Sequence, residues 1–230
     1  MKKIVVLSGA GISAESGIST FRDSNGLWEN HDIMEVASPQ GWHANPELVL
    51  NFYNQRRKQA TTVHPNEGHL ALARLEDRYY VTVVTQNVDN LHERAGSTNI
   101  IHLHGELFKS RSTCDETLVY NMDHWELNLG DTCEKGSQLR PHIVWFGELV
   151  PMMDKAIKEV RKADIFIVVG TSLQVYPAAG LLDYVSKDIP TYVIDPKMPQ
   201  VHQRKNLFLI EEKASTGLKK LTDQLLAEVS

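Results

Sequence analysis

The chain has 230 residues, of which 42% are hydrophobic and 23% charged, and its formal net charge is −5. These values fit a globular protein with one sizeable core, or with one core and a smaller module. A slightly acidic chain without an apolar run near the roughly 20 residues of a membrane span predicts no nucleic-acid partner and no membrane partner. Met1 lies almost directly before a strand, and Cys114 and Cys133 form no disulfide framework, so we expect a cytoplasmic protein.

The first predicted element is a short apolar strand over Lys3–Leu7, followed by Gly9, Gly11 and Ala14 in G-x-G-x-x-A spacing. This spacing is typical of a dinucleotide-binding turn. The first glycine permits the turn, the second lets backbone approach a pyrophosphate, and the small third residue lets a helix pack closely. The N–H groups of that helix would face the phosphates. An ordinary turn is the alternative, but polar residues and glycines continue to Asp23, which favours the nucleotide.

Further apolar runs alternate with helical patterns along the chain. The runs are near-continuously apolar, as in strands covered on both faces: Tyr80–Thr85, Ile100–Leu103, Ile165–Val169, Thr191–Ile194 and Leu207–Ile210. Helix start signals stand at Asn66, Pro151, Pro177 and Ser215 or Thr216. This alternation predicts an α/β fold with a doubly wound parallel sheet.

Two stretches lack that rhythm, so the chain divides into a main domain and an inserted lobe. The expected domain comprises residues 1–23, 63–106 and 141–230. The expected lobe comprises residues 24–62, with helical patterns, and 107–140, which read as polar and irregular.

An acid about 20 residues beyond the glycines usually binds the adenosine ribose. No strand precedes an acid in that region here. Asp195, which ends the strand Thr191–Ile194, is the candidate replacement, with a strand-terminal turn before Pro196 as the alternative. This arrangement predicts a nucleotide site wound in an unusual order.

Polar residues cluster after two neighbouring strands. Gln86, Asn87 and Asp89 follow Tyr80–Thr85, where ligands bind in open α/β sheets, although a polar turn that caps the next helix is the alternative. His102 and His104 lie two residues apart and face the same way in strand alternation. No third ligand at a suitable spacing supports a metal site. We expect one histidine to be structural and the other to be a general base.

Five segments in register resemble the sirtuin family across essentially the whole chain: GAGISAESGISTFRD, TQNVDNLHERAG, HLHGEL, RPHIVWFGE and GTSLQVYPAAGL. The resemblance implies a Rossmann-like domain with a smaller inserted lobe. It also implies NAD-dependent removal of acyl groups from lysines of acylated proteins, with release of nicotinamide and O-acyl-ADP-ribose. An NAD-dependent protein ADP-ribosyltransferase is the alternative function. The sequence leaves the oligomeric state open, and a monomer is compatible with it.

Roles carried over by motif position assign the catalytic work to His104, Asn87 and Asp89. His104 would activate a ribose hydroxyl as a base, while Asn87 and Asp89 would hold the carboxamide and the ribose. An acid at Asp195, where the family usually has Asn, would favour NAD over NADP. The implied NAD-binding residues are Gly9, Ala10, Gly11, Ser13, Glu15, Phe21, Arg22, Asp23, Gln86, Asn87, Val88, Asp89, Gly170, Thr171, Ser172, Asp195, Pro196, Lys197 and Ala214.

The acyl-lysine peptide would lie extended between Phe146-Gly147-Glu148 and Leu173-Gln174-Val175 and add a strand through main-chain hydrogen bonds. Residues Val144 to Phe146 would form an apolar wall for the lysine. The implied substrate residues are Tyr53, Arg56, Val144, Phe146, Gly147, Glu148 and Val175.

Tyr53 and Arg56 lie three residues apart on a helix that begins at Asn45 and Pro46. A phenol and a guanidinium so placed can bind a carboxylate. With Ala14, Tyr-x-x-Arg resembles the bacterial class III sirtuins, which remove succinyl and malonyl as well as acetyl groups. The alternative is a solvated basic helix face, because Arg57 and Lys58 are adjacent.

Many sirtuins hold a structural zinc with two Cys-x-x-Cys pairs. This chain has only Cys114 and Cys133 in the corresponding region, two thiolates where a closed site needs four ligands. We therefore predict that zinc is weak or absent. Apolar packing would hold the lobe instead, through Leu118, Tyr120, Trp125 and Leu127.

Overall fold

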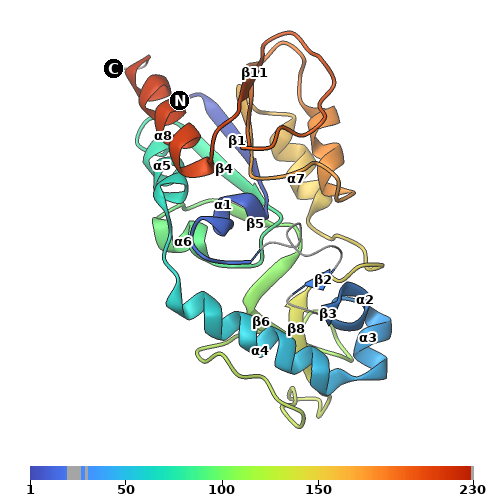
Figure 1. Ribbon diagram of the computed structural model, residues 1–230. Coiled ribbons are helices and arrows are strands. Elements are labelled where there is room, and N and C mark those ends of the chain that lie inside the picture. The colour runs from blue at the N-terminus through green and yellow to red at the C-terminus, as the bar shows by residue number, and fades with distance from the viewer. Residues whose placement is uncertain (20–26, 29–30, 229–230) are drawn as a thin grey trace.

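The structure, a computed structural model, describes residues 1–19, 27–28 and 31–228. Its larger layer is a six-stranded sheet in which every neighbouring pair is parallel (Figure 1). The strands are β1 (Lys3–Ser8), β4 (Tyr80–Thr85), β5 (Ile100–His102), β9 (Ile165–Val169), β10 (Thr191–Ile194) and β11 (Leu207–Ile210). The predicted doubly wound α/β fold is confirmed.

The strand order is β11-β10-β9-β1-β4-β5. The chain therefore builds outward from β1 in one direction through β4 and β5, and later in the other direction through β9, β10 and β11. This is the usual order of a dinucleotide-binding sheet, so the prediction of an unusual order was wrong. The early acid is absent because a long insertion delays the second strand until Tyr80, and that strand ends in Thr85 rather than in an acid.

Helices cover both faces of this sheet. Alternate residues of β1 point to opposite sides: Ile4 and Val6 pack in one core, and Val5 and Leu7 in the other. The first core is closed by α5 (Glu67–Leu75) and α8 (Ala214–Ala227), and the second by α7 (Met153–Val160) and the 3₁₀ helix η2 (Ala178–Tyr184). Both faces of the inner strands β1, β9 and β10 are buried, which explains why these strands lack polar alternation.

The helix start signals hold in part. Asn66 caps α5, where its Oδ1 accepts a hydrogen bond from the N–H of Gly68 at 2.9 Å. The segment after Pro177 forms a 3₁₀ helix, and α7 begins at Met153. Ser215 and Thr216 do not cap the last helix, because α8 already begins at Ala214 and Ser215 binds the Glu15 carboxylate instead.

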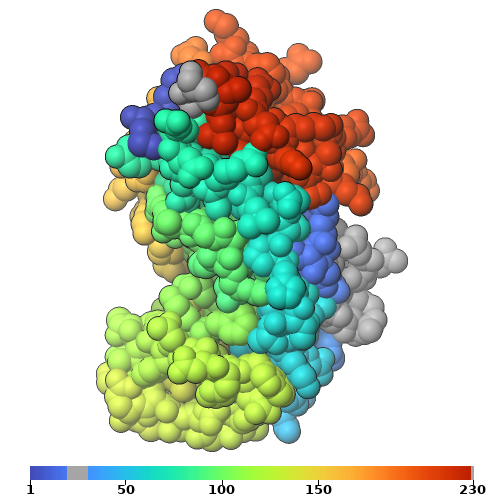
Figure 2. Space-filling view, turned by 90° about the vertical axis from the view of Figure 1, so that its left-hand side faces the viewer, coloured from blue at the N-terminus to red at the C-terminus, as the bar shows by residue number. Residues whose placement is uncertain are grey.

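The smaller lobe combines helices with a second sheet. In Figure 2 the yellow-green residues of this lobe form one end of the molecule. Antiparallel pairing joins β7 and β8 to either side of β6, so the prediction that residues 107–140 are irregular was wrong for these strands. Strands β6 and β8 contain polar side chains at buried positions, so they lack the apolar run or the alternation by which a strand is predicted. The prediction is confirmed for residues 113–118 and 122–138, which form no helix or strand apart from one isolated bridge between Thr132 and Gln138. The elements are α2 (Ile33–Val36), α3 (Pro39–Ala44), α4 (Pro46–Thr62), β6 (Gly105–Ser112), β7 (Val119–Asn121), β8 (Leu139–Ile143) and the two-residue strands β2 (Leu27–Trp28) and β3 (His31–Asp32). Because β6 begins at Gly105 and β8 ends at Ile143, both cross the expected domain boundaries, which stay a prediction.

Polar side chains of α4 hold much of this lobe together. Arg57 is fully buried and donates to the carbonyl oxygens of Trp125 at 2.7 Å and Leu107 at 3.3 Å. Asn54 bonds both main-chain groups of Leu127, at 2.9 and 3.1 Å. Of the four apolar residues predicted to hold the lobe, only Leu127 is buried. The prediction was wrong for the other three because this segment is anchored through its backbone.

None of the helices in the described part of the chain is both long and apolar enough to cross a membrane.

Candidate active site

The glycine turn meets β9 at the point where the strand order reverses. The N–H of Gly11 donates to the carbonyl of Gly170 at 2.8 Å, and that of Gly9 to Val169 at 3.0 Å. A Cβ at Gly11 would lie 2.7 Å from the Cα of Gly170, and Gly170 itself has φ +62°. Close approach between these two backbones therefore requires the glycines. The helix after the turn, α1 (Ala10–Ala14), has only five residues.

The polar segment Gln86–Asp89, which follows β4, contacts the glycine turn and the end of β9. The Gln86 amide donates to Thr171 Oγ1 at 3.0 Å and so bridges the ends of β4 and β9. The Asn87 amide donates to Ser13 Oγ at 3.0 Å, and Ser13 donates in turn to Asp89 Oδ2 at 2.9 Å. Burial raises the pKa of Asp89, although hydrogen bonds from Leu91 and Ser13 oppose this effect. Hydrogen bonds thus connect Ser13 with Asn87 and Asp89, and Gln86 with Thr171.

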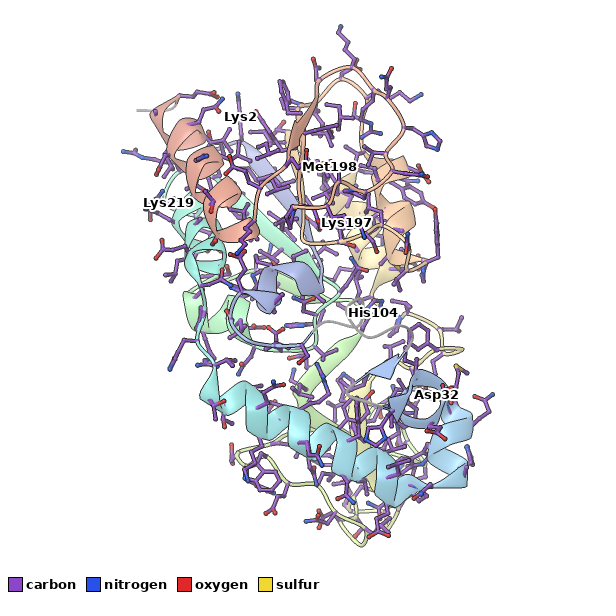
Figure 3. All side chains as sticks on the ribbon, in the orientation of Figure 1. Lys2, Asp32, His104, Lys197, Met198 and Lys219 are labelled. Carbon is purple, nitrogen blue, oxygen red and sulfur yellow. The ribbon has the colours of Figure 1, made fainter. Side chains whose placement is uncertain are left out.

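The two histidines occupy different environments beside this cluster. His104 Nδ1 lies 3.0 Å from the carbonyl oxygen of Gln86, and burial lowers the pKa of the ring. His102 Nδ1 lies 3.1 Å from the carbonyl oxygen of Asn87, and its Nε2 lies 2.6 Å from Glu93 Oε1 on α6 (Leu91–Ala95). Figure 3 shows His104 between the large sheet and the smaller lobe.

Tyr53 of α4 is fully buried at the core of the smaller lobe. Its hydroxyl accepts a hydrogen bond from Trp145 Nε1 at 3.1 Å, and burial raises its pKa to about 12. The Arg140 guanidinium carbon stacks 3.3 Å from the centroid of the Trp145 ring. The Tyr53 hydroxyl therefore stays protonated at physiological pH.

Glu148, a predicted substrate residue, directs its carboxylate inward. It accepts hydrogen bonds from Arg140 at 2.7 and 3.1 Å, from Arg111 at 3.1 Å and from the Trp145 N–H at 2.8 Å. Burial is the largest single influence and raises the pKa of Glu148, but the hydrogen bonds from Arg140 and Trp145 and the charges of Arg140 and Arg111 together leave this pKa below its usual value. These bonds support the segment that carries Trp145.

Arg56 and Arg57 are both buried, so the alternative of a solvated basic helix face was wrong. Arg56 is 8% exposed, and its guanidinium carbon lies 5.7 Å from the Phe52 ring centroid. Only Lys58 of this basic run is exposed.

The main chain at the expected peptide groove is partly occupied. The N–H of Phe146 donates to Ala37 O, and that of Glu148 donates to Trp145 O. Phe146 is 43% exposed, Val144 and Val175 are half-buried, and a Cβ at Gly147 would meet nothing within 4 Å.

Other predicted residues lie around the edge of the cluster. Asp195 is 4% exposed and accepts from the Lys197 N–H at 2.9 Å, so the strand-terminal turn is present. Glu15 binds Ser215 at the start of α8, beside buried Ala214. Pro196 and Lys197 are exposed, Ser172 and Val88 are half-buried, and Ala10 is exposed. Phe21, Arg22 and Asp23 lie outside the described residues.

Sequence reasoning missed a layer of supporting hydrogen bonds. Thr85 Oγ1 accepts from the Asn87 N–H at 3.0 Å and from Ser8 Oγ at 2.8 Å, and Ser8 Oγ lies 2.9 Å from His92 Nε2. The available signal was a polar residue at the end of two otherwise apolar strands. The roles of Arg140 and Trp145 had no such signal, because they come from long-range packing.

No group of three or more His, Cys, Asp or Glu side chains able to hold a metal occurs among residues 1–19, 27–28 and 31–228. The thiols of Cys114 and Cys133 lie 3.3 and 3.2 Å from Ser112 Oγ.

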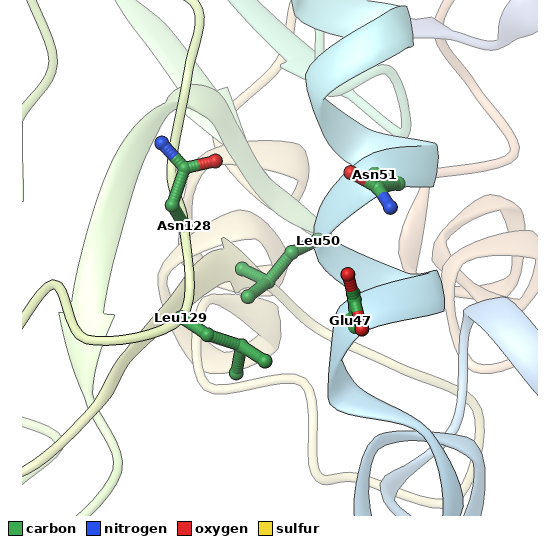
Figure 4. A pocket seen from close by; sticks show the side chains of 5 residues that line it. All are labelled: Glu47, Leu50, Asn51, Asn128 and Leu129. Atoms are coloured by element: carbon green, nitrogen blue, oxygen red, sulfur yellow. The ribbon is translucent and has the colours of Figure 1, made fainter.

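A hollow of about 250 Å³ separates α4 from the segment at Asn128 (Figure 4). It contains no predicted site residue. Its lining is Glu47, Leu50, Asn51, Asn128 and Leu129. We place the candidate site at the strand ends instead, because ligands of open α/β sheets bind where the strand order reverses.

Comparison with known proteins gives one family match, one curated relative and two solved structures. The Sir2 family model matches residues 9–177. An NAD-dependent protein deacylase of Helicobacter pylori is 56% identical over 230 residues, which cover 100% of both chains. A solved Sir2 homolog–NAD complex has a TM-score of 0.90 at 39% identity, covering 100% of this chain and 91% of its own. A Sir2 protein bound to acetylated peptide has a TM-score of 0.80 at 28% identity, covering 99% and 94%.

Proposed function

This chain belongs to the Sir2 family and is an NAD-dependent protein lysine deacylase, and from that premise we propose how its residues divide the work. NAD binds at the ends of β1, β4 and β9, and the enzyme removes succinyl and malonyl as well as acetyl groups. The observation that carries the assignment is the junction of the Gln86–Asp89 segment with the glycine turn and His104 where the strand order reverses.

The position of the glycine turn fits a dinucleotide site. Gly9, Gly11 and Gly170 let the turn pack directly against the end of β9, and ligands in such sheets bind outside the carboxyl ends of the strands where the strand order reverses. The Asp195 carboxylate at the end of β10 is suited to ribose hydroxyls and would repel a 2′-phosphate, so NAD is preferred to NADP. NAD supplies an electrophilic ribose carbon and nicotinamide as the leaving group.

Asn87 and Asp89 are assigned to the nicotinamide and ribose side. Their side chains are 7% and 6% exposed and share Ser13 as a hydrogen-bond partner, which restricts their motion. A cluster held in this way meets the need for a preorganised site.

His104 is assigned as the base. A carbonyl oxygen cannot donate, so Nδ1 carries the hydrogen that binds Gln86 O, and the neutral ring then has its lone pair at Nε2. Because burial lowers the pKa of His104, the ring is neutral at physiological pH. Nε2 can then accept a proton from a ribose hydroxyl.

The acyl-lysine peptide is assigned to the strip between Phe146-Gly147 and Leu173-Gln174-Val175. Since the N–H groups of Phe146 and Glu148 are already bonded within the chain, pairing would use carbonyl oxygens on that side. Recognition through main-chain atoms predicts a weak preference for the sequence around the lysine.

Tyr53 and Arg56 are assigned to the distal carboxylate of a succinyl or malonyl group. The Tyr53 hydroxyl accepts from Trp145, so its own hydrogen remains to be donated to an acyl oxygen. Arg56 lies close enough for its charge to lower the pKa of Tyr53, against the larger effect of burial. A guanidinium and a phenol in one buried site favour a carboxylate over an uncharged acyl end.

The test compares nicotinamide release with acetyl-lysine and succinyl-lysine peptides in wild type, Arg56→Met and the control Lys58→Met. Loss of a charged hydrogen bond corresponds to roughly 10- to 150-fold in kcat/KM. We expect that loss for the succinyl peptide in Arg56→Met, with the acetyl reaction within about threefold of wild type. Equal effects on both peptides, or no succinyl activity in wild type, would remove the carboxylate assignment.

A further inference from the structure

His102 ends β5 with both ring nitrogens facing acceptors. Nδ1 lies 3.1 Å from the carbonyl oxygen of Asn87, and Nε2 lies 2.6 Å from Glu93 Oε1. Neither a carbonyl nor an ionised carboxylate can donate a hydrogen bond, so both ring nitrogens must carry hydrogen to satisfy both partners. The side chain of His102 is 9% exposed, so a positively charged ring lies in the protein interior beside Glu93.

His102 and His104 hold two successive carbonyl groups. His104 binds the carbonyl of Gln86, and His102 binds that of Asn87. His104 has one such contact, through Nδ1, whereas His102 is held at both nitrogens. The side chain of Asn87 continues from this anchored backbone to Ser13, and Ser13 leads to Asp89.

We propose that the charged pair of His102 and Glu93 is a positioning device for NAD cleavage, in which His102 fixes the main chain of Asn87. A neutral His102 would present a lone pair either to the Asn87 carbonyl or to Glu93. A lone pair at Nδ1 cannot bind the Asn87 carbonyl, so in that case the Gln86–Asp89 segment would lose this hydrogen bond. His102 touches neither NAD nor the acyl group in this role, so it acts through Asn87 and Asp89.

Several charged groups act on His102. Burial alone would lower the pKa of His102, but the hydrogen bond and charge of Glu93 outweigh it, with smaller support from the Asn87 carbonyl and from Glu106 of β6. Asp89 of the loop and His92 of α6 also interact with His102. Burial lowers the pKa of His92 to about 3, so that ring is neutral and adds no competing charge.

The charge on His102 makes its hydrogen bond to the Asn87 carbonyl depend on pH. The pKa of His102 in the folded protein lies above the ordinary imidazole value. The ring is therefore fully charged below the ordinary value and loses its charge as the pH rises through the raised pKa. The pKa of His104 lies below its ordinary value, so the base is neutral before physiological pH is reached. The two histidines together predict that the rate of nicotinamide release depends on pH in a bell-shaped way. His104 sets the acid limb and His102 sets the alkaline limb.

The test measures nicotinamide release against pH at saturating acetyl-lysine peptide in wild type, Glu93→Gln and the control Glu76→Gln. Glu76 accepts hydrogen bonds from Thr98 and has none to His102. In Glu93→Gln we expect the alkaline limb to move about one pH unit lower and kcat at pH 8 to fall about tenfold. The KM for peptide should stay unchanged, and both limbs should remain in place in Glu76→Gln.

Two results would overturn the proposal. One is an alkaline limb that stays at the same pH in Glu93→Gln. A fall in melting temperature alone would count in the same way, because a purely structural role of the pair predicts it. The other comes from wild-type protein with ¹⁵N-labelled histidine: a neutral tautomer at His102 at pH 7 contradicts the charged pair, whereas two protonated ring nitrogens support it. Failure of the succinyl assignment would leave both measurements valid, since they use the acetyl reaction.

Discussion

Glu148 joins Arg111 and Arg140 to the main chain of Trp145, and its replacement by glutamine should destabilise the protein. The side chain of Glu148 is 18% exposed, and those of Arg111 and Arg140 are 10% exposed. In Glu148→Gln both guanidinium groups would remain buried without a compensating negative charge. The amide would also direct N–H groups toward these donors.

The expected loss is about 3 kcal/mol. Removing one partner of a buried ion pair costs roughly 3–5 kcal/mol, and the lower end applies because glutamine keeps one acceptor oxygen. For a chain of this length, a loss of about 1 kcal/mol lowers the melting temperature by roughly 2–4 °C. The melting temperature of Glu148→Gln should therefore fall by about 6–12 °C.

The assay is urea and thermal unfolding beside the matched variant Glu106→Gln. Glu106 pairs with Lys109 at 2.8 Å, and both side chains are about one-third exposed, at 32% and 33%. A pair of that kind contributes about 0–1 kcal/mol. If Glu148→Gln and Glu106→Gln were equally stable, the reasoning from the buried network would be refuted.

The same network predicts a pH dependence. The pKa of Glu148 in the folded state lies below its ordinary value. Its contribution to stability is therefore complete above the unfolded value of about 4.3 and is lost as pH falls through the lower folded value. The stability difference between wild type and Glu148→Gln should shrink below about pH 4, measured by urea unfolding at each pH.

The remaining predictions concern the glycine turn, the base and zinc. In Gly170→Ala a Cβ would stand 2.4 Å from the Ile12 nitrogen at φ +62°, so unfolding should show a loss of about 2–4 kcal/mol; wild-type stability would contradict this close approach. The acid limb of kcat/KM should lie below the ordinary imidazole pKa of about 6.5 because burial lowers the pKa of His104, and a limb above that value would count against His104 as the base. Protein purified without added metal should carry far less than one zinc per chain and keep its melting temperature in EDTA, whereas stoichiometric zinc by mass spectrometry would disprove the prediction for Cys114 and Cys133.

The large sheet could be predicted from the sequence because its inner strands are buried on both faces and its edge strand β11 is also a continuous apolar run, although Phe208 and Leu209 of that strand are exposed. Continuous apolar runs such as Ile165–Val169 have no competing explanation when helices lie between them. The smaller sheet could not be predicted in this way. In β6 the polar residues Ser110, Arg111 and Ser112 are buried, so the polarity of the sequence does not report which residues face inward.

The polar cluster was predictable where neighbouring strands end together. Asn87 and Asp89 follow a strand that lies beside β1, so the topology brings them to the glycine turn. The orientation of Glu148 was not predictable, because its partners Arg111 and Arg140 lie 37 and 8 residues away and meet it only when β6 and β8 pair. Sequence spacing likewise could not show that Arg57 is buried while its neighbour Lys58 is exposed.

The most direct test of the central assignment is nicotinamide release from NAD with an acetyl-lysine peptide, in wild type and in His104→Ala. We predict release that depends on the acylated peptide and falls by about 10²- to 10⁴-fold in His104→Ala, the usual contribution of a general base. Release at the same rate without acylated peptide, or full activity in His104→Ala, would contradict the assignment of the deacylase site to this cluster.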